Sequence, residues 1–195
     1  MKRLFDIIAA ILVLIMGLPF FIIIALLIVL DGKGGVFYSQ ERIGRYKRSF
    51  NLYKFRTMQP GSDSLGQLTI GSKDSRVTSI GYYLRKYKID EFPQLINIIA
   101  GHMSVVGPRP EVPKYVKMYN QEQLNVLKVR PGLTDYASLV YFKENELLGK
   151  AQDPENVYIK EIMPQKLALN NKYIKEKGML TDLNIILKTL LRIFN

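Results

Sequence analysis

The chain has 195 residues, enough for one modest domain and one additional segment. Its formal net charge of +11 and pI of about 9.7 favour anionic partners such as phospholipid, nucleotide or nucleic acid. It contains no cysteine and a single histidine, His102, which excludes disulfides and thiolate chemistry and argues against His-based triads and His-rich zinc sites. A covalent nucleophile would then be a carboxylate, hydroxyl or lysine, and a metal would be a hard cation such as magnesium.

The N-terminal segment is apolar. After Lys2 and Arg3, residues 7–30 contain no charge. Such a segment is long enough to cross a bilayer, since a helix rises ~1.5 Å per residue against a hydrocarbon core of ~30 Å. It is too long for the apolar core of a secretory signal. Gly17-Leu18-Pro19 lies near its middle, and a proline inside a helix removes one hydrogen bond and crowds the preceding turn.

Pro19 leaves two topologies open. The segment either spans the bilayer as a kinked helix, or enters one leaflet, turns at Pro19 and leaves by the same face. Each half is about one leaflet deep at ~1.5 Å per residue. Positive residues mark the cytoplasmic side of a membrane, and they flank both ends of this segment. The flanking charges therefore favour the re-entrant form.

The segment is followed by two predicted strands, residues 36–43 and 49–56, joined by a turn that contains Gly44. They form either an ordinary basic hairpin or one that brings Lys54 and Arg56 to an anionic ligand. Residues 59–75 are rich in glycine, serine and aspartate and are predicted to form a loop. A loop of this size is more often functional or mobile than idle.

Two adjacent carboxylates stand at the predicted start of a short helix. Asp90 occupies the expected N-cap position, Pro93 lies in the first turn, and Gly101 ends the helix after four apolar residues. The positive end of a helix keeps the carboxylates of Asp90 and Glu91 ionised and also attracts phosphate. Taken alone, the pair is explained by helix capping or by catalysis. Three cations precede it: Arg85, Lys86 and Lys88.

Arg109 lies in a rigid frame, between Pro108 and Pro110 and after Gly107. A guanidinium held in one direction suits a phosphate or diphosphate. A rigid turn with a solvated arginine is the alternative. A second proline-glycine turn covers residues 129–135.

Three later segments are predicted to be helical: residues 111–127, 157–176 and 178–195. The last carries an apolar stripe, with Lys188 and Arg192 on the other face. It either packs into the core or lies on anionic lipid. The stripe consists of Met179, Leu180, Leu183, Ile186, Leu187, Leu190, Leu191 and Phe194.

Five motifs follow one another along the chain. They are Gln40-Glu41-Arg42-Ile43-Gly44, Tyr53-Lys54-Phe55-Arg56-Thr57-Met58, Asp90-Glu91-Phe92-Pro93-Gln94-Leu95, Gly107-Pro108-Arg109-Pro110 and Arg130-Pro131-Gly132-Leu133-Thr134. In this order they resemble the small monotopic phosphoglycosyl transferases, the bacterial sugar-transferase family that starts glycan assembly on polyprenyl phosphate. The resemblance covers nearly the whole chain.

The resemblance implies an α+β fold that is mainly helical, with a small β-hairpin and interfacial amphipathic helices. Residues 1–31 are expected to form a re-entrant membrane helix with its hinge at Pro19. Residues 32–195 are expected to form a catalytic domain on the cytoplasmic face of the bacterial inner membrane.

The resemblance also implies a reaction. Members of the family transfer a sugar-1-phosphate from a nucleotide diphosphate sugar, expected here to be a UDP-sugar, to undecaprenyl phosphate, with Mg²⁺ as cofactor. The products are a polyprenyl-diphosphate-sugar and UMP. Asp90 matches the nucleophile, which would carry the phosphosugar covalently between two steps, and Glu91 matches its magnesium-binding neighbour.

Four cations belong to the expected site. Arg85 and Arg109 match phosphate-binding arginines of the family, and Lys54 and Arg56 are expected to bind the anionic substrate from the second strand. The expected partners are the nucleotide sugar, polyprenyl phosphate and membrane lipid. A homodimer, the sugar and the nucleobase are left open.

Three residues depart from the family pattern. Leu18 stands where relatives often have serine, His102 replaces an acidic residue and is interpreted as structural, and Asp135 stands where many relatives have glycine. The rival hypothesis is a non-catalytic, membrane-anchored protein that binds anionic lipid or nucleic acid. The two acids among the cations favour the enzyme, and the chain contains no recognised nucleic-acid motif, so no nucleic acid partner is expected.

Overall fold

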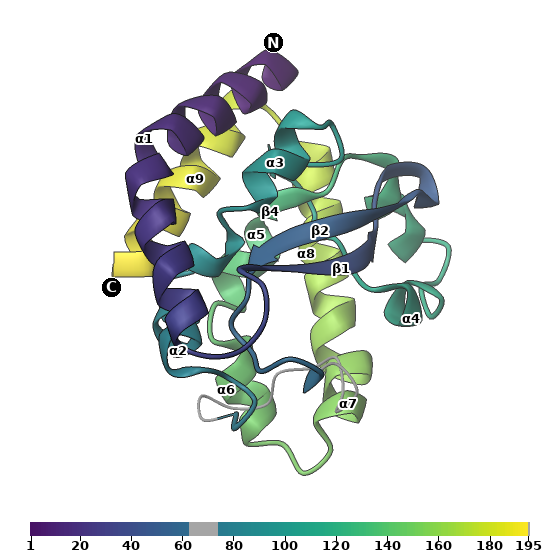
Figure 1. Cartoon of the computed structure of the whole chain (residues 1–195). Helices are drawn as coiled ribbons and strands as arrows, with labels where there is room; N and C mark the ends of the chain where they lie inside the picture. Colours follow the sequence, from purple (N-terminus) through teal and green to yellow (C-terminus); the bar gives the residue numbers. More distant parts are fainter. Residues whose placement is uncertain (63–73, 195) are drawn as a thin grey trace.

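The structure is a computed structural model that describes residues 1–62 and 74–194, so most of the predicted loop at 59–75 lies outside the described residues. Figure 1 shows the course of the chain. The α-helices are α1 Lys2–Leu30, α2 Ser79–Lys86, α3 Gln94–Ile99, α4 Pro113–Val116, α5 Tyr136–Val140, α6 Glu144–Gly149, α7 Pro154–Val157, α8 Met163–Glu176 and α9 Met179–Phe194. The strands are β1 Phe37–Ile43, β2 Ser49–Phe55, β3 Ser104–Val106 and β4 Gly132–Thr134. The tighter or wider turns are η1 Arg45–Lys47, η3 Ile89–Glu91, η4 Gln123–Lys128 and the π-helical η5 Tyr158–Ile162. The predicted α+β, mainly helical fold is confirmed.

The predicted hairpin is present. Strands β1 and β2 pair antiparallel, from Phe37 opposite Phe55 to Ile43 opposite Ser49. Tyr46 and the residue after it have positive φ angles of 58° and 61°, which turns the chain tightly between the strands. The inner side chains of β2 pack with α1 and α3 in one buried cluster, so the hairpin is held against these two helices.

A second, parallel strand pair joins the two proline-glycine turns. β3 lies beside β4, with Ser104 opposite Gly132. The two turns are in backbone contact at Gly107 and Gly132. A Cβ at position 132 would overlap the backbone of Gly107, and a Cβ at position 107 would overlap the backbone of the other turn. The amide of Gly107 donates to the carbonyl of Thr134 at 3.0 Å. Both glycines are therefore required for the close approach of two segments that lie 25 residues apart.

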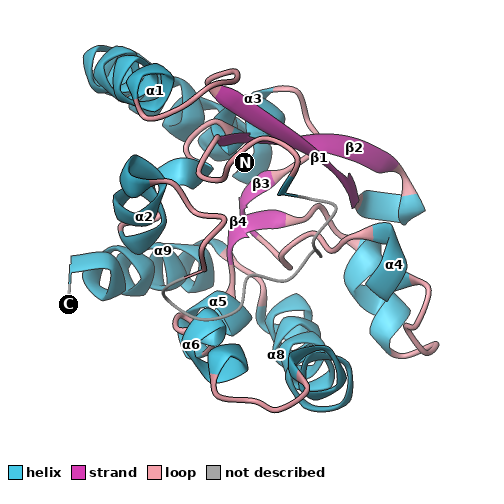
Figure 2. Cartoon of the chain, turned by 60° about the horizontal axis from the view of Figure 1, so that its bottom comes forward, coloured by secondary structure: helices cyan, strands magenta, loops and turns pink. Residues whose placement is uncertain are grey.

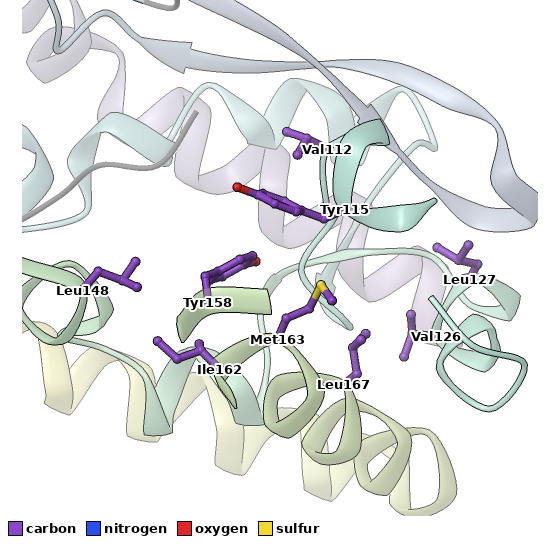
Figure 3. Close-up of a cluster of buried hydrophobic side chains, with 9 residues drawn as sticks. All are labelled: Val112, Tyr115, Val126, Leu127, Leu148, Tyr158, Ile162, Met163 and Leu167. Carbon is purple, nitrogen blue, oxygen red and sulfur yellow. The ribbon is translucent and has the colours of Figure 1, made fainter. Parts of the chain in front are cut away.

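The largest buried cluster lies between α4, η4 and the helices α6 to α8 (Figure 3). Its members are Val112, Tyr115, Val126, Leu127, Leu148, Tyr158, Ile162, Met163 and Leu167. Just before Val112, the carboxylate of Glu111 accepts hydrogen bonds from the Tyr158 hydroxyl and from Arg42 of β1. Arg42 also donates to the carbonyl of Pro110 at 3.2 Å. This cluster therefore fixes the end of the turn that carries Arg109.

The single helix predicted over residues 111–127 is wrong. The chain forms only α4 and, after a turn, η4. Asn120 and Gln123 exchange two side-chain-to-backbone hydrogen bonds of 2.9 Å each, an arrangement that begins a new helical turn. The reciprocal cap at Asn120 satisfies donors that a continuous helix would have bonded internally. The helices predicted over 157–176 and 178–195 are confirmed as η5 with α8 and as α9.

Helix α1 continues through Pro19 without interruption. It is the one helix among residues 1–62 and 74–194 that is long and apolar enough to cross a membrane by length and composition. Only 11% of its most apolar stretch is buried, whereas the core helix of a soluble protein would be mostly buried. The exposed apolar surface indicates a membrane location for α1.

Both ends of α1 are bonded to the same folded domain. At the N-terminal end, Lys2 forms an ion pair with Asp182 of α9, and Asp6 accepts a hydrogen bond of 2.8 Å from the Ser104 hydroxyl. At the C-terminal end, Asp31 accepts a hydrogen bond of 2.7 Å from the amide of Ile80 in α2. Further bonds at the N-terminal end run from Lys2 to the carbonyl of Val106, from Arg3 to the carbonyls of Ile99 and Met103, and from the amide of Val105 to Asp6.

The apolar stripe of α9 is mostly exposed, with Leu180 at 84% of its full accessibility. The buried side of the helix is formed instead by Asp182 and Ile185. Figures 1 and 2 both show α9 on the same side of the molecule as α1. Exposure of this stripe favours the interfacial interpretation over packing into the core.

Candidate active site

The two acids lie in a strained turn. Lys88, just before η3, is left-handed with a φ of 57°, a conformation that non-glycine residues seldom adopt. The predicted N-cap role of Asp90 is wrong, because α3 begins later, with Pro93 at its cap position. The amide of Phe92 donates to the carbonyl of Ile89, and Pro93 has no N–H, so the backbone needs no side-chain cap here. The carboxylate of Asp90 is therefore free for other partners.

Glu91 forms the centre of an ion-pair network. It is 8% exposed, and the guanidinium of Arg109 donates to both of its oxygens, to Oε2 at 3.1 Å. Lys54 of β2 donates to Oε1 at 3.2 Å. Burial alone would raise the pKa of Glu91, but the charges of Arg109 and Lys54 outweigh it and lower this pKa well below its usual range. Glu91 is therefore ionised at neutral pH.

Asp90 is 4% exposed, and its two oxygens differ. Oδ2 lies 3.5 Å from the ammonium of Lys54. Oδ1 is buried and has no hydrogen-bond partner among the described residues. A buried oxygen without a donor is uncommon in native proteins and is often found where a ligand or a reaction uses it.

Arg85 reaches the acids from α2. Its Nε donates to the hydroxyl of Thr57 at 3.0 Å, while Nη1 is buried with no partner in the described part of the chain. Burial lowers the pKa of Arg85, and Asp90 is the strongest opposing charge. Helix α2 can lie this close to Thr57 because it has glycine at position 81, where any side chain would overlap the backbone of Thr57. Arg85 therefore offers a free donor beside Asp90.

Arg109 is held from its backbone side by Asp135. The fully buried carboxylate of Asp135 accepts the amide of Arg109 at 3.0 Å and caps α5 by accepting the amide of Ser138 at 2.6 Å. Sequence reasoning named Asp135 only as a departure from the family pattern. The available signal was an aspartate before a helical segment, a typical N-cap. The strand pair β3–β4 then brings the capped helix to the arginine turn.

The structure does not bring Arg56 into this cluster. Its guanidinium is buried and donates to four backbone carbonyls at 2.7–2.9 Å, at and beyond the C-terminal end of α1. These carbonyls belong to Ile28, Gly32, Lys33 and Gly35. The contacts support a structural role, in place of the phosphate contact expected from the sequence. The charged atoms that could have reached a substrate are engaged in closing the end of the helix.

The structure also places the other two residues that depart from the family pattern, His102 and Leu18. His102 stacks on the ring of Phe50 with centroids 5.5 Å apart, in agreement with a structural interpretation. Leu18 is exposed on α1, as its neighbours are.

The donor set suits a hard cation in part. No group of three or more acidic or histidine side chains gathers in residues 1–62 and 74–194. Within that part of the chain, Oε2 of Glu91 accepts one hydrogen bond, so a second lone pair remains. Carboxylate oxygens are the ligands that Mg²⁺ prefers, and Mg²⁺ usually takes one or two from the protein and the rest from water and phosphate.

The chain matches the family described as Bacterial sugar transferase over residues 1–195. Several curated proteins are similar over almost the whole chain. The chain therefore belongs to the bacterial sugar transferase family, a family of enzymes.

Three relatives show the range of the similarity. The UDP-N-acetylgalactosamine-undecaprenyl-phosphate N-acetylgalactosaminephosphotransferase of Aeromonas hydrophila is 34% identical over 97% of this chain. The exopolysaccharide production protein ExoY of Rhizobium meliloti (strain 1021) is 33% identical over 97% of it. The UDP-glucose:undecaprenyl-phosphate glucose-1-phosphate transferase of Caulobacter vibrioides is 34% identical over 96%. The matched region spans 42% of the Aeromonas protein, 83% of the Rhizobium protein and 67% of the Caulobacter protein.

Proposed function

We propose that this protein transfers a sugar-1-phosphate from a nucleotide diphosphate sugar, a UDP-sugar in the first instance, to undecaprenyl phosphate. The observation that carries the proposal is the buried carboxylate of Asp90, whose Oδ1 has no donor although three cations surround the acid pair. Two of the relatives named above support the substrate classes, because their names specify both undecaprenyl phosphate and a UDP-sugar.

In the first step, Oδ1 of Asp90 attacks the phosphorus that carries the sugar. The new Asp90 O–P bond forms as the bond from this phosphorus to the bridging oxygen breaks, and the electron pair leaves with the nucleoside monophosphate. A carboxylate nucleophile is already deprotonated, so no general base is needed. This suits a chain with one histidine, which stacks on the ring of Phe50.

The cations orient the diphosphate. Arg109 and Lys54 neutralise Glu91 before substrate binds, and a diphosphate offers them oxygens of higher charge. Arg85 supplies its unpartnered Nη1 beside Asp90. Because this Nη1 is unpartnered, Arg85 can donate to the phosphoryl oxygens as their charge develops without breaking another hydrogen bond.

Glu91 is the residue that we expect to hold Mg²⁺, through the lone pair of Oε2 that the described residues leave unoccupied. A bound Mg²⁺ would neutralise the diphosphate and the departing monophosphate.

In the second step, a phosphate oxygen of undecaprenyl phosphate attacks the same phosphorus and displaces the Asp90 carboxylate. The product is the sugar linked to the lipid through a diphosphate, and Asp90 is regenerated. Helices α1 and α9, which both carry exposed apolar side chains, lie on one side of the molecule, where they would place the site at the depth of the lipid phosphate.

We also propose that α1 enters and leaves the bilayer on the cytoplasmic face. The support is the attachment of both helix ends to one domain, through Lys2 and Asp6 at one end and Asp31 at the other. A spanning helix would place one of these ends across ~30 Å of hydrocarbon from the domain.

Tags at the two termini test this topology. A tag before Met1 and a tag after Asn195 are both expected to be protected from an external reagent in intact cells. Pro19→Leu restores the backbone N–H that proline lacks inside α1 and is expected to shift the first tag outward in part of the molecules. Labelling of the N-terminal tag alone in the wild-type protein would establish a spanning helix.

The reaction is tested without the lipid. Incubating the purified protein with a UDP-sugar and Mg²⁺ is expected to add the mass of one phosphosugar to the peptide that contains Asp90. Hydroxylamine should remove it, as it cleaves acyl phosphates, and undecaprenyl phosphate should discharge it into the lipid product. A panel of nucleotide sugars, scored by nucleoside monophosphate release, identifies the donor. A protein that turns over with both substrates but never carries the adduct would indicate direct attack by the lipid phosphate.

A further inference from the structure

Unpartnered buried polar atoms concentrate around the acid pair. Among the residues that the structure describes, five buried side-chain nitrogen or oxygen atoms have no hydrogen-bond partner, and three of them belong to residues 85–94. These three are Nη1 of Arg85, Oδ1 of Asp90 and Nε2 of Gln94. Leaving such atoms unpaired destabilises a protein, so a cluster of them calls for an explanation outside folding. The reaction proposed above accounts for Arg85 and Asp90 but assigns nothing to Gln94.

Gln94 lies directly after the acid pair along the chain. It is the first residue of α3, three positions after Glu91, and only 1% exposed. The intervening backbone forms tight 3₁₀-type turns, since the amide of Phe92 donates to the carbonyl of Ile89 and the amide of Leu95 donates to the carbonyl of Phe92. Residues three apart in such turns lie one above the other. Gln94 therefore shares a face with Glu91, the neighbour of Asp90.

The next residue of α3 with a side-chain amide is Asn97, and its hydrogen bonds differ from those of Gln94. Asn97 is completely buried, and its Nδ2 donates to the carbonyl of Asn51 at 2.8 Å while its Oδ1 accepts the amide of Tyr53 at 3.1 Å. Asn97 thus ties α3 to β2. Gln94 has no comparable bond from its Nε2, so its donor does not hold the fold together in the described structure.

We propose that Gln94 is a substrate-binding residue, whose Nε2 donates a hydrogen bond to a non-bridging oxygen of the phosphoryl group that moves onto Asp90. Arg85 would donate to the same group from α2, through its unpartnered Nη1. A neutral amide suits this position because it binds the phosphoryl oxygen without forming an ion pair with Asp90. The inference rests on the proposed transfer reaction and adds a residue to it.

Gln94→Met tests the proposal. Methionine keeps the length of the side chain and removes its polar atoms. Because the lost donor is unpartnered in the resting protein, the thermal unfolding midpoint is expected to stay equal or rise. Turnover and the single-turnover rate of adduct formation are expected to fall about 100-fold, as is typical for one lost donor to a developing oxyanion.

The matched control is Asn170→Leu in α8. Asn170 is also buried, and its Oδ1 is also without a partner among the described residues, but it lies outside the acid cluster. Its replacement is expected to leave turnover unchanged and the midpoint equal or higher. The pair of variants therefore separates removal of an unpartnered polar atom from removal of a substrate contact.

Gln94→Met with turnover within about threefold of wild type would overturn the proposal, since a lost donor to the phosphoryl group costs far more. Should Gln94→Met not unfold cooperatively, Gln94→Glu decides by the same criterion, because it keeps the shape and replaces the donor with an acceptor. Absence of an adduct in the wild-type protein would overturn the covalent route alone. The Gln94 contact would still be judged, from the release of nucleoside monophosphate when both substrates are present.

Discussion

Asp90→Asn is expected to fold like the wild-type protein and to lose turnover to the background rate. The amide has the size of the carboxylate and the side chain is nearly buried, so the packing around η3 should survive. Its oxygen is too weak a nucleophile to displace a phosphate, and loss of an enzyme's nucleophile reduces turnover by about 10⁴-fold or more. Nucleoside monophosphate release measures the loss, and circular dichroism with thermal unfolding measures the fold.

The same variant should carry no phosphosugar when it is incubated with the donor and Mg²⁺ alone. An adduct that persists in Asp90→Asn would place the nucleophile on another residue. Turnover close to wild type would reduce Asp90 to an electrostatic partner of Lys54 and Arg85.

Arg109→Lys is expected to reduce kcat/KM by about 10²–10³-fold while the protein remains folded. The two nitrogens of the guanidinium bind both oxygens of Glu91 in the resting site, and lysine offers one ammonium on a flexible stem. The fork geometry, and not the charge alone, is what the diphosphate would use. Steady-state kinetics and thermal unfolding give the two quantities.

Arg48→Lys is the matched control for this substitution. Arg48 is exposed next to the hairpin turn, so the same chemical change there should alter neither turnover nor the unfolding midpoint. A fully active Arg109→Lys would make the motif around Arg109 a structural turn. In that case the main role of Arg109 would be the hydrogen bond that its backbone amide donates to Asp135.

The sequence predicted the elements whose signal is local. The hairpin follows from two runs of strand-forming residues with a turn between them, and α1 and α9 follow from length and from an apolar stripe. The contact between β3 and β4 could not be predicted in this way. Each strand is three residues long, and their pairing depends on two glycines that meet only in the folded chain.

The sequence named candidate site residues but could not predict their contacts. Asp90, Glu91, Lys54 and Arg109 form one network of ion pairs, and the charge of Asp90 acts on Arg85. Arg56 shares a strand motif with Lys54, yet its side chain turns to the end of α1. The alternation of side chains along a strand indicates on which face a residue lies, but not whether its side chain binds a backbone carbonyl or a substrate on that face.

The attachment of α1 has a practical consequence for anyone who wants a water-soluble enzyme. Its first turn binds the segment that connects α3, after the acid pair, with the turn that carries Arg109. Deleting α1 would remove Asp6, the partner of the Ser104 hydroxyl, and the carbonyl of Ile28, one of the four that the guanidinium of Arg56 binds. The acid pair and the turn that carries Arg109 would then lose the helix that supports the segment between them. Solubility is better sought by replacing lipid-facing leucines and isoleucines with polar residues, because the apolar helix α1 also supports the structure of the active site.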